Sequence, residues 1–354
     1  MFLAWKEIRY EKLRYTLIIA MIVLISYLIF ILTSLAQGLA RQNTDAVKSW
    51  DIQMIALNDN ADTSMTQSII TKSQLAKVQT SKKTAIVTQV PVIVRGAGNH
   101  KVSAQFVGIN REQFIMKNLK VIDGKKPTKN NEVLVDSSLK QAGYQIGDKI
   151  ELNSGQSKFS ISGFVNNAKL NISPVIYGDN RVAQVLKNAG PTFAVSAVVS
   201  QNSKIILGKN SGLKNYSLAG FIKKLPGYTA QTTTFIFMIG FLMVISLVVV
   251  AVFLYILTMQ KLENYAVLRA QGVPVSVLVR ATISQSLLIV ISGLIVGTVL
   301  TGLTASFIPA AVPMYFSIPL LSVVAIGLVI VALLGVIIPI RIVTRVDPVT
   351  VIGG

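Results

Sequence analysis

This chain of 354 residues contains no cysteine and few charged residues. Without cysteine, neither a disulfide framework nor a Cys-based metal site can form, so any domain outside a membrane must be stabilised by its own core. Only 14% of the residues are charged, whereas a soluble domain normally carries about 25%. Because 52% of the residues are hydrophobic, the composition indicates a membrane protein.

The sequence also lacks a GxxxxGK[ST] phosphate-binding loop. The nearest approach, Gly208-Lys209-Asn210, has neither the spacing nor the hydroxyl residue. The chain therefore has no P-loop of its own with which to bind ATP. There is a single histidine, His100, between two predicted strands. We interpret it as a water-facing residue at a hairpin tip, with metal or haem ligation as the alternative, because no second ligand is suggested nearby.

Three long runs contain no Asp, Glu, Lys or Arg: residues 16–36, 225–260 and 281–340. A bilayer core of about 30 Å needs roughly 20 apolar helical residues. The third run is long enough for two crossings, and three prolines near its middle predict a hairpin. The sequence thus predicts four transmembrane helices, at residues 16–37, 231–259, 281–306 and 319–340. A cleaved signal peptide is the alternative for the first run, but its apolar stretch is about twice a usual signal core.

Lys and Arg in short flanking segments predict the orientation. Nine basic residues flank the runs on one side: Lys6, Arg9, Lys12, Arg14, Lys261, Arg269, Arg280, Arg341 and Arg345. They predict that both termini (1–15 and 341–354) and the segment 260–280 are cytoplasmic. Residues 38–228 would then be outside the cytoplasmic membrane. That segment carries the other 25 of the 34 basic residues, which suits an anionic neighbour or simply a lysine-rich soluble surface.

The segment 38–228 is expected to form a mixed α/β domain inserted between the first and second transmembrane helices. Residues 38–50 can continue the first helix as a stalk. Short β-rich runs follow, separated by Gly, Asn and Asp, at 85–94, 102–109, 132–135, 149–152, 159–165 and 174–177. Helices are expected at 65–80 and 137–142.

Three segments resemble the MacB/FtsX-like superfamily of ABC transporter permeases: NEVLVDSSL and GYQIGDKI at 131–150, KLENYAVLRAQG at 261–272, and VDPVTVIGG at 346–354. The opening residues 6–15, the stalk SLAQGLARQN at 34–43 and the Ile-Gly-Gly end look like HrtB-type haem-export permeases. The resemblance implies a homodimer bound to two copies of a separate ATPase subunit. It also implies a transport permease, not an enzyme.

The segment between the second and third spans is the expected ATPase coupling element, as the resemblance implies. A helical stretch from Gln260 to Ala270 would be broken by Gly272-Val273-Pro274, because glycine and proline end helices. An ordinary interfacial turn is the alternative. The expected coupling residues are Lys261, Glu263, Leu268, Arg269, Gln271, Gly272 and Pro274. Residues 2–15 fit an amphipathic helix at the inner membrane surface, which resembles the elbow helix of the family.

A substrate site is expected near the outer leaflet. Tyr27, Phe30, Ser34, Gln37 and Arg41 share one helix face by their spacing, as do Gln231, Phe235, Met238 and Leu242. Joined across a dimer, these faces would form an aromatic cleft with a basic lip, to which Met21 and Tyr228 also contribute. Haem would fit such a cleft, with its iron on Met238 or Tyr27 and its propionates on basic side chains. Plain helix packing is the alternative explanation.

The predicted function is therefore export of haem from the membrane, driven by motions of a separate ATPase. Haem would be a transported ligand and not a permanent cofactor. No metal site of the protein's own and no nucleic acid are expected. The alternatives are export of a peptide, antibiotic or lipid, and mechanical regulation of an extracellular cell-wall hydrolase or a sensor. Gly293 and Gly297 form a small-xxx-small motif that predicts close helix packing within the four-helix unit.

Overall fold

The computed structural model describes residues 12–96, 101–153, 155, 157–309 and 312–345. The chain divides into two compact units, which we name the helical unit (Met1–Gly38 with Thr232–Gly354) and the sheet unit (Leu39–Gln231). Residues 1–11, His100 and the tail from 346 lie outside the described residues, so the predicted elbow helix, the hairpin-tip histidine and most of the predicted tail stay predictions.

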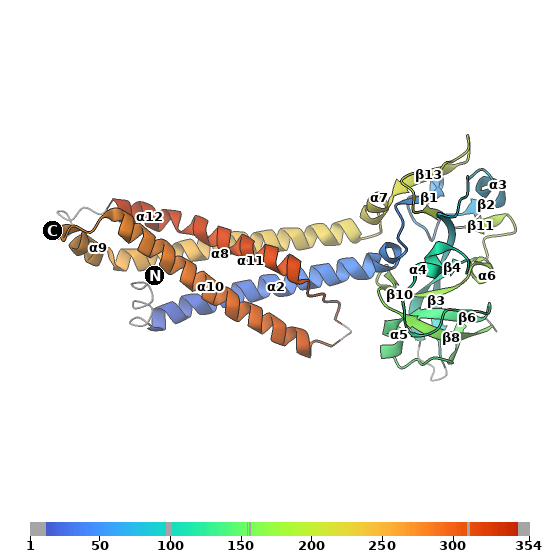
Figure 1. Ribbon diagram of the computed structural model, residues 1–354, viewed down its shortest axis with the longest axis horizontal. Coiled ribbons are helices and arrows are strands. Elements are labelled where there is room, and N and C mark those ends of the chain that lie inside the picture. The colour runs from blue at the N-terminus through green and yellow to red at the C-terminus, as the bar shows by residue number, and fades with distance from the viewer. Residues whose placement is uncertain (1–11, 97–100, 154, 156, 310–311, 346–354) are drawn as a thin grey trace. The chain divides into compact units, whose positions relative to one another are not determined.

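The helical unit is built from long apolar helices (Figure 1). Its helices are α2 (Lys12–Ser49), α8 (Tyr228–Gln260), α9 (Leu262–Ala270), α10 (Val275–Phe307), α11 (Ile318–Gly335) and α12 (Ile337–Thr344), with the ends of α2 and α8 belonging to the sheet unit. Among the described residues, four stretches are long and apolar enough to cross a membrane: Lys12–Ser49, Tyr228–Gln260, Val275–Phe307 and Ile318–Thr344. This agrees with the four predicted spans.

The helix ends differ from the predicted boundaries. α10 begins at Val275, inside the segment 260–280 that was predicted to separate two spans, because Pro274 with φ −69° caps a helix that then continues without a break. α2 runs through the predicted stalk as far as Ser49. The fourth span continues past the predicted residue 340 to Thr344 as α12, after a break at Val336.

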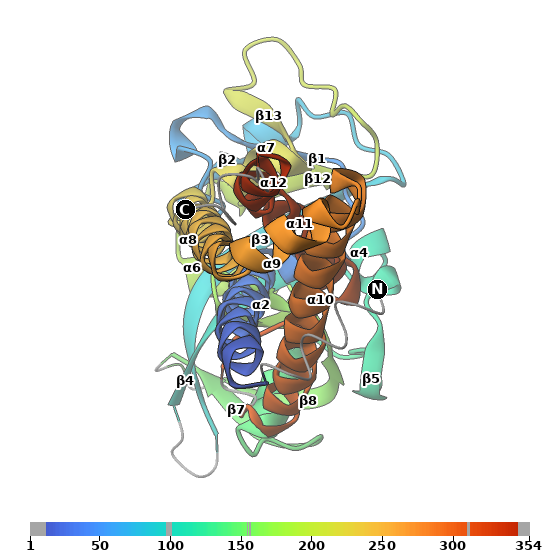
Figure 2. The same cartoon turned by 90° about the vertical axis from the view of Figure 1, so that its left-hand side faces the viewer.

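One core joins the long helices, which run side by side in both views (Figures 1 and 2). Its buried members come from every span: Ile18, Ile29 and Phe30 of α2, Val250 and Leu254 of α8, Ile289 and Leu294 of α10, and Val324 and Leu328 of α11. Many other apolar side chains of the same helices are exposed, among them Leu24, Phe241, Ile295 and Ile330. Helices whose outer face is also apolar are typical of proteins embedded in lipid.

The two glycines of α10 allow close contact with α2. A Cβ atom built on Gly293 would lie 2.5 Å from Cγ2 of Ile22, and one built on Gly297 would lie 2.3 Å from Oγ of Ser26. Thr301, one turn further, is buried and donates its hydroxyl to the Gly297 carbonyl at 2.8 Å. The small-xxx-small face therefore packs within the four-helix unit, as predicted.

We expect Gly293→Ala to destabilise the helical unit, because the new methyl group would overlap Ile22, whose branched Cβ cannot move aside. Overpacking of this kind costs about 1–3 kcal/mol. The matched control is Gly302→Ala on the same helix, where a Cβ would meet nothing within 4 Å. The measurement is the thermal unfolding midpoint of each variant in detergent. Equal midpoints for the two variants would contradict the close contact.

In the described part of the sheet unit, eleven strands form one sheet and two more form a separate pair (Figure 1). Its strands are β1 (Met54–Asn58), β2 (Ile70–Thr71), β3 (Thr84–Arg95), β4 (Lys101–Ile109), β5 (Val121–Gly124), β6 (Glu132–Asp136), β7 (Lys149–Leu152), β8 (Lys158–Val165), β9 (Lys169–Leu170), β10 (Ser173–Asp179), β11 (Phe193–Val195), β12 (Ala197–Ser200) and β13 (Leu213–Ser217). The order along the main sheet is β13-β1-β12-β3-β4-β10-β6-β8-β5. β4 pairs with β10, and β6 with β8, in parallel; the other pairs are antiparallel.

Short helices connect these strands: η1 (Asp59–Ala61), α3 (Lys72–Leu75), α4 (Phe114–Asn118), α5 (Ser137–Gln141), α6 (Asn180–Lys187) and α7 (Leu218–Lys223). The six predicted strands correspond to β3, β4, β6, β7, β8 and β10, and the predicted helix at 137–142 is α5. A mixed α/β domain is therefore confirmed.

The predicted helix at 65–80 is wrong. Turns lead from Met65 into the short strand β2, and only Lys72–Leu75 are helical. Thr71 and Gln74 form a capping box, which starts a new helix at Lys72 and prevents a continuous one from Met65. β2 pairs with β11, a strand more than a hundred residues later, and such a partner is invisible to local periodicity.

The largest fully buried side chain, Trp50, anchors the end of α2 in the sheet unit's core. Its indole Nε1 donates to the hydroxyl of Tyr177 at 3.0 Å. Burial raises the pKa of Tyr177 well above its ordinary value, so the hydroxyl stays protonated. The pair satisfies two polar groups that would otherwise be buried without partners.

Candidate functional site

The predicted coupling segment folds as expected. α8 ends at Gln260, α9 covers Leu262–Ala270, and Gly272 follows with φ +89°, a left-handed conformation that glycine adopts at little cost. Pro274 then caps α10. The helix-turn-helix arrangement holds a short helix between two spans.

α9 presents one exposed face, which we name the α9 face and which consists of Glu263, Asn264, Val267, Ala270 and Gln271. The spacing of these residues places them on one side of the helix. Val267 is 46% exposed, although it is a large apolar residue. A single exposed apolar residue is common on protein surfaces, so what distinguishes this face is its place on a short helix between two spans.

The opposite side of α9 packs inward. Tyr265 forms a small core with Leu278 of α10 and Val343 of α12, and Leu268 packs against it. Most of the predicted coupling residues are accessible: the exposed ones are Glu263, Gln271, Gly272 and Pro274, and Arg269 is half-buried. Leu268 instead packs against the small core and holds α9 in place. The helix is thus attached to two spans of the helical unit through its inner face.

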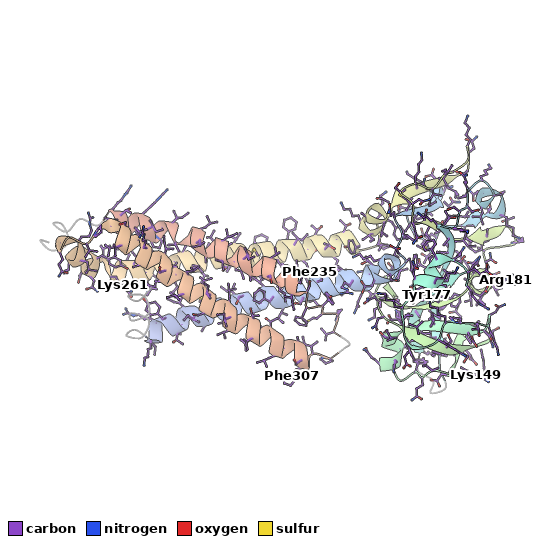
Figure 3. The ribbon with its side chains drawn as sticks, viewed as in Figure 1. Lys149, Tyr177, Arg181, Phe235, Lys261 and Phe307 are labelled. Carbon is purple, nitrogen blue, oxygen red and sulfur yellow. The ribbon has the colours of Figure 1, made fainter. Side chains whose placement is uncertain are left out.

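Lys261, predicted as a coupling residue, is buried with 8% of its surface exposed. Its Nζ donates to the hydroxyl of Tyr15 on α2 at 2.9 Å and lies 5.6 Å from the centre of that ring. The side-chain amide of Gln285 on α10 donates to the same hydroxyl. Figure 3 labels Lys261 at the end of the bundle near α9. We name Tyr15, Lys261 and Gln285 the polar junction.

The polar junction joins three helices through one phenol oxygen, at the point where α8 turns into α9. Arg14 on α2 adds a bond to the side chain of Gln260, at 2.8 Å. Sequence reasoning missed Tyr15 and Gln285. Gln285 could have been predicted as a buried hydrogen-bonding residue, because an amide within a run of apolar span residues needs a hydrogen-bond partner inside the protein.

Substitution of either Tyr15 or Lys261 should destabilise the helical unit. Tyr15→Phe should lower the free energy of unfolding more than Lys261→Met. Phenylalanine removes the acceptor and leaves a buried ammonium with fewer partners, whereas methionine removes the charge and keeps the apolar stem. The combined variant should be less destabilised than the sum, with a coupling of about 0.5–3 kcal/mol. Unfolding midpoints in detergent measure this, with the exposed Lys12→Met as control. Strict additivity would contradict the junction.

The predicted substrate residues on α2 face the interior of the helical unit. The hydroxyl of Tyr27 lies 2.9 Å from Oγ1 of Thr304 on α10, and Phe30 is buried in the helical core. Ser34 is also buried, and its hydroxyl has no hydrogen-bond partner among the described residues. Its carbonyl accepts the backbone N–H of Tyr315 at 3.0 Å. Gln37 is half-buried.

The two methionines of the predicted site, Met21 and Met238, are more exposed than the predicted residues Phe30 and Ser34 on α2. Met238 is 41% exposed and Met21 is 36% exposed, while Phe235 is half-buried and Leu242 packs against the helical core. Within one chain Phe30 is buried and Tyr27 is half-buried, whereas the two methionines are exposed. Whether a second copy brings them together stays a prediction.

Three predicted residues belong to the sheet unit and have partners there. Arg41 pairs with Asp45 at 3.2 Å and donates to Asn167 at 3.1 Å. The side chain of Gln231 accepts from Asn43 at 3.1 Å, and Tyr228 packs against the core around Trp50. Over the described ranges, no group of three or more His, Cys, Asp or Glu side chains is placed to hold a metal ion.

Two family models match the chain. The MacB-like periplasmic core domain matches residues 16–209, and the FtsX-like permease C-terminal region matches residues 236–348. Together they cover the first span, most of the sheet unit and the remaining spans.

Relatives match over the full length. A protein of Staphylococcus haemolyticus named as a hemin transport system permease, HrtB, is 26% identical over 99% of both chains. A protein of the same name from Staphylococcus epidermidis is 25% identical over 99% of both. Among solved structures, the periplasmic region of MacB from Actinobacillus actinomycetemcomitans has 18% identity and a TM-score of 0.34, covering 48% of this chain and 91% of that one.

Proposed function

Because the chain belongs to the MacB/FtsX-like superfamily of ABC transporter permeases, we propose that it exports haem from the membrane as a homodimer driven by a separate ATPase. The full-length similarity to permeases named for hemin transport is the observation that carries the choice of cargo. A permease of an ABC transporter implies an ATPase partner, and the absence of a P-loop in this sequence fits that division of labour.

The proposed orientation places the termini and α9 in the cytoplasm and the sheet unit outside. Its support is the distribution of basic residues, because the short segments beside the spans at that end hold Lys and Arg while the connection from α10 to α11 holds none. In this orientation the α9 face meets the cytoplasmic ATPase.

The polar junction would pass the motion of the ATPase on to the spans. A force applied to α9 acts on Lys261 at its base, and Lys261 is bonded to Tyr15 of α2, which is bonded to Gln285 of α10. Buried hydrogen-bond networks of this kind make the contact between helices more rigid. α9 would therefore move α2 and α10 together.

Haem would bind at the face of α8 that carries Met238. A thioether is an accepted axial ligand for haem iron, and the exposed apolar side chains around it suit a porphyrin ring. Tyr27 is the weaker candidate for the iron because its hydroxyl is engaged with Thr304. Met21 is half-exposed on α2 and would line the same lipid-side entrance in a dimer.

Haemin titration of the purified protein tests the cargo. We expect a Soret shift with the wild type and a weakened or altered shift with Met238→Ala, because the sulfur ligand is lost. Met259→Ala is the matched control: this methionine is 42% exposed on the same helix, near its other end. Tyr27→Phe should have the smaller effect.

Two results would contradict the proposal at different levels. No Soret shift with the wild type would favour another amphipathic cargo or a permease without cargo. A wild-type shift that Met238→Ala and Tyr27→Phe both leave unchanged would move the haem site elsewhere and leave the fold untouched.

Val267→Asp should weaken the association with the cognate ATPase subunit, because it places a charge on the exposed apolar residue of the α9 face. We expect at least about a tenfold loss in affinity, which corresponds to about 1.4 kcal/mol. The control is Ser276→Asp, an exposed position in the first turn of α10 where an acidic residue favours the helix. Co-purification of the ATPase at graded concentrations is the measurement. Equal recovery with both variants would place the docking surface elsewhere.

A further inference from the structure

The sheet unit contains a cleft of about 1010 Å³ that none of the proposed transport steps uses. It lies where the parallel strands β4 and β10 end side by side, with Ile109 opposite Asp179 in the register. A loop into α4 follows β4, and α6 follows β10, so backbone and side chains from both connections surround the cleft. Ligands of α/β sheets bind characteristically at the carboxyl ends of neighbouring parallel strands.

The cleft combines an apolar wall with a basic rim. Ala85, Ile86, Phe114 and Val198 contribute the apolar part. Four basic residues from separate segments also line it, and the acidic residues Glu112 and Asp179 leave a net charge of +2. The four basic residues are Lys82 before β3, Arg111 after β4, Lys117 on α4 and Arg181 on α6.

Arg111 differs from the other three basic residues because its guanidinium is already held. It donates to the carbonyl of Thr128 and the side chain of Asn130, and lies 3.9 Å from the carboxylate of Asp179. Asp179 in turn caps α6. Arg111 therefore fixes the two connections around the cleft and is not the group that a ligand would meet.

Lys82, Lys117 and Arg181 are the cations left for a ligand. All three side chains are exposed, and within the described ranges the structure gives no side-chain hydrogen bond or ion pair to any of the three. Three like charges around one cleft repel one another, and an anion placed between them relieves that repulsion. Lysine and arginine recognise carboxylate and phosphate groups through charge-assisted hydrogen bonds.

We propose that this cleft binds a small amphipathic anion: an apolar body carrying two or more carboxylate or phosphate groups. The apolar wall takes the body of the ligand, and Lys82, Lys117 and Arg181 take its charged groups. The cleft lies entirely in the sheet unit, so the proposal does not rest on haem export or on the ATPase partner.

The test uses the full-length protein in nanodiscs of phosphatidylcholine and the fluorescent probe 1,3,6,8-pyrenetetrasulfonate. This probe is a flat aromatic tetra-anion whose charges keep it out of a neutral bilayer. Fluorescence anisotropy should report saturable binding to the wild type. The variant Lys82→Gln/Lys117→Gln/Arg181→Gln should bind at least about tenfold more weakly, since each lost contact is charge-assisted.

The matched control is Lys149→Gln/Lys204→Gln/Lys209→Gln, which removes three exposed cations of the same unit away from the cleft. Figure 3 labels Lys149 and Arg181 in different parts of the sheet unit. The control should bind within about twofold of the wild type. An equal loss in both triple variants, or no saturable binding by the wild type, would overturn the proposal.

Two further measurements keep the result decisive. The single variant Arg181→Glu should also bind the probe more weakly than the wild type. Unfolding midpoints check that each variant is folded. Inorganic pyrophosphate should displace the probe only at much higher concentration, because it cannot use the apolar wall. If pyrophosphate bound as tightly as the probe, the assignment to an amphipathic ligand would be wrong. If the wild type bound the probe but gave no Soret shift with haemin, haem export would be contradicted and this cleft would still stand.

Discussion

A hydrocarbon bilayer offers no hydrogen-bond partner, and this constraint determines the helical unit. Within the hydrocarbon region, the backbone N–H and C=O groups must form hydrogen bonds inside the protein, and a helix provides them along its own length. This is why the charge-free runs form helices. Polar side chains there also need partners inside the protein, although the Ser34 hydroxyl has none among the described residues. Thr301 bonds back to its own helix, and Gln285 and Lys261 share the hydroxyl of Tyr15. The spans are therefore held together by the packing of their shared apolar core, which is closest at the glycines of α10, and by a few polar bonds.

The same constraint explains why the two units have different secondary structure. Where water is present, strands can pair, and the sheet unit uses this freedom to bring loops from distant parts of the chain to one edge of its sheet. The parallel pairing of β4 with β10 is what places Arg111 beside Asp179. The spans have no such freedom, so their chemistry is confined to side chains on helix faces. We propose on this basis that the helices handle the apolar cargo and that the sheet unit meets soluble, charged molecules.

Much of the fold was predictable because its signals are local. Charge-free runs predicted the spans, β-rich runs and turn residues predicted six strands, and glycine and proline predicted the end of α9. Several missed strands depend on distant partners: β2 needs β11, and β1 needs β12 and β13. β9 and α6 were missed although their partners or caps are local. The sites were less predictable. Spacing placed Tyr27, Phe30 and Ser34 on one face correctly, but it could not show that this face meets α10 and the loop before α11.

The sequence by itself determined that this chain has four spans and an inserted α/β domain, because hydrophobic run length and charge placement depend on the residues alone. Its motifs also indicated the permease family. Only the tertiary structure decided that Lys261 is buried against Tyr15 while Val267 is exposed, and that Lys82, Lys117 and Arg181 surround one cleft. Which side of a helix is covered, and which loops meet, depends on packing between segments far apart in the chain, and no local pattern encodes that.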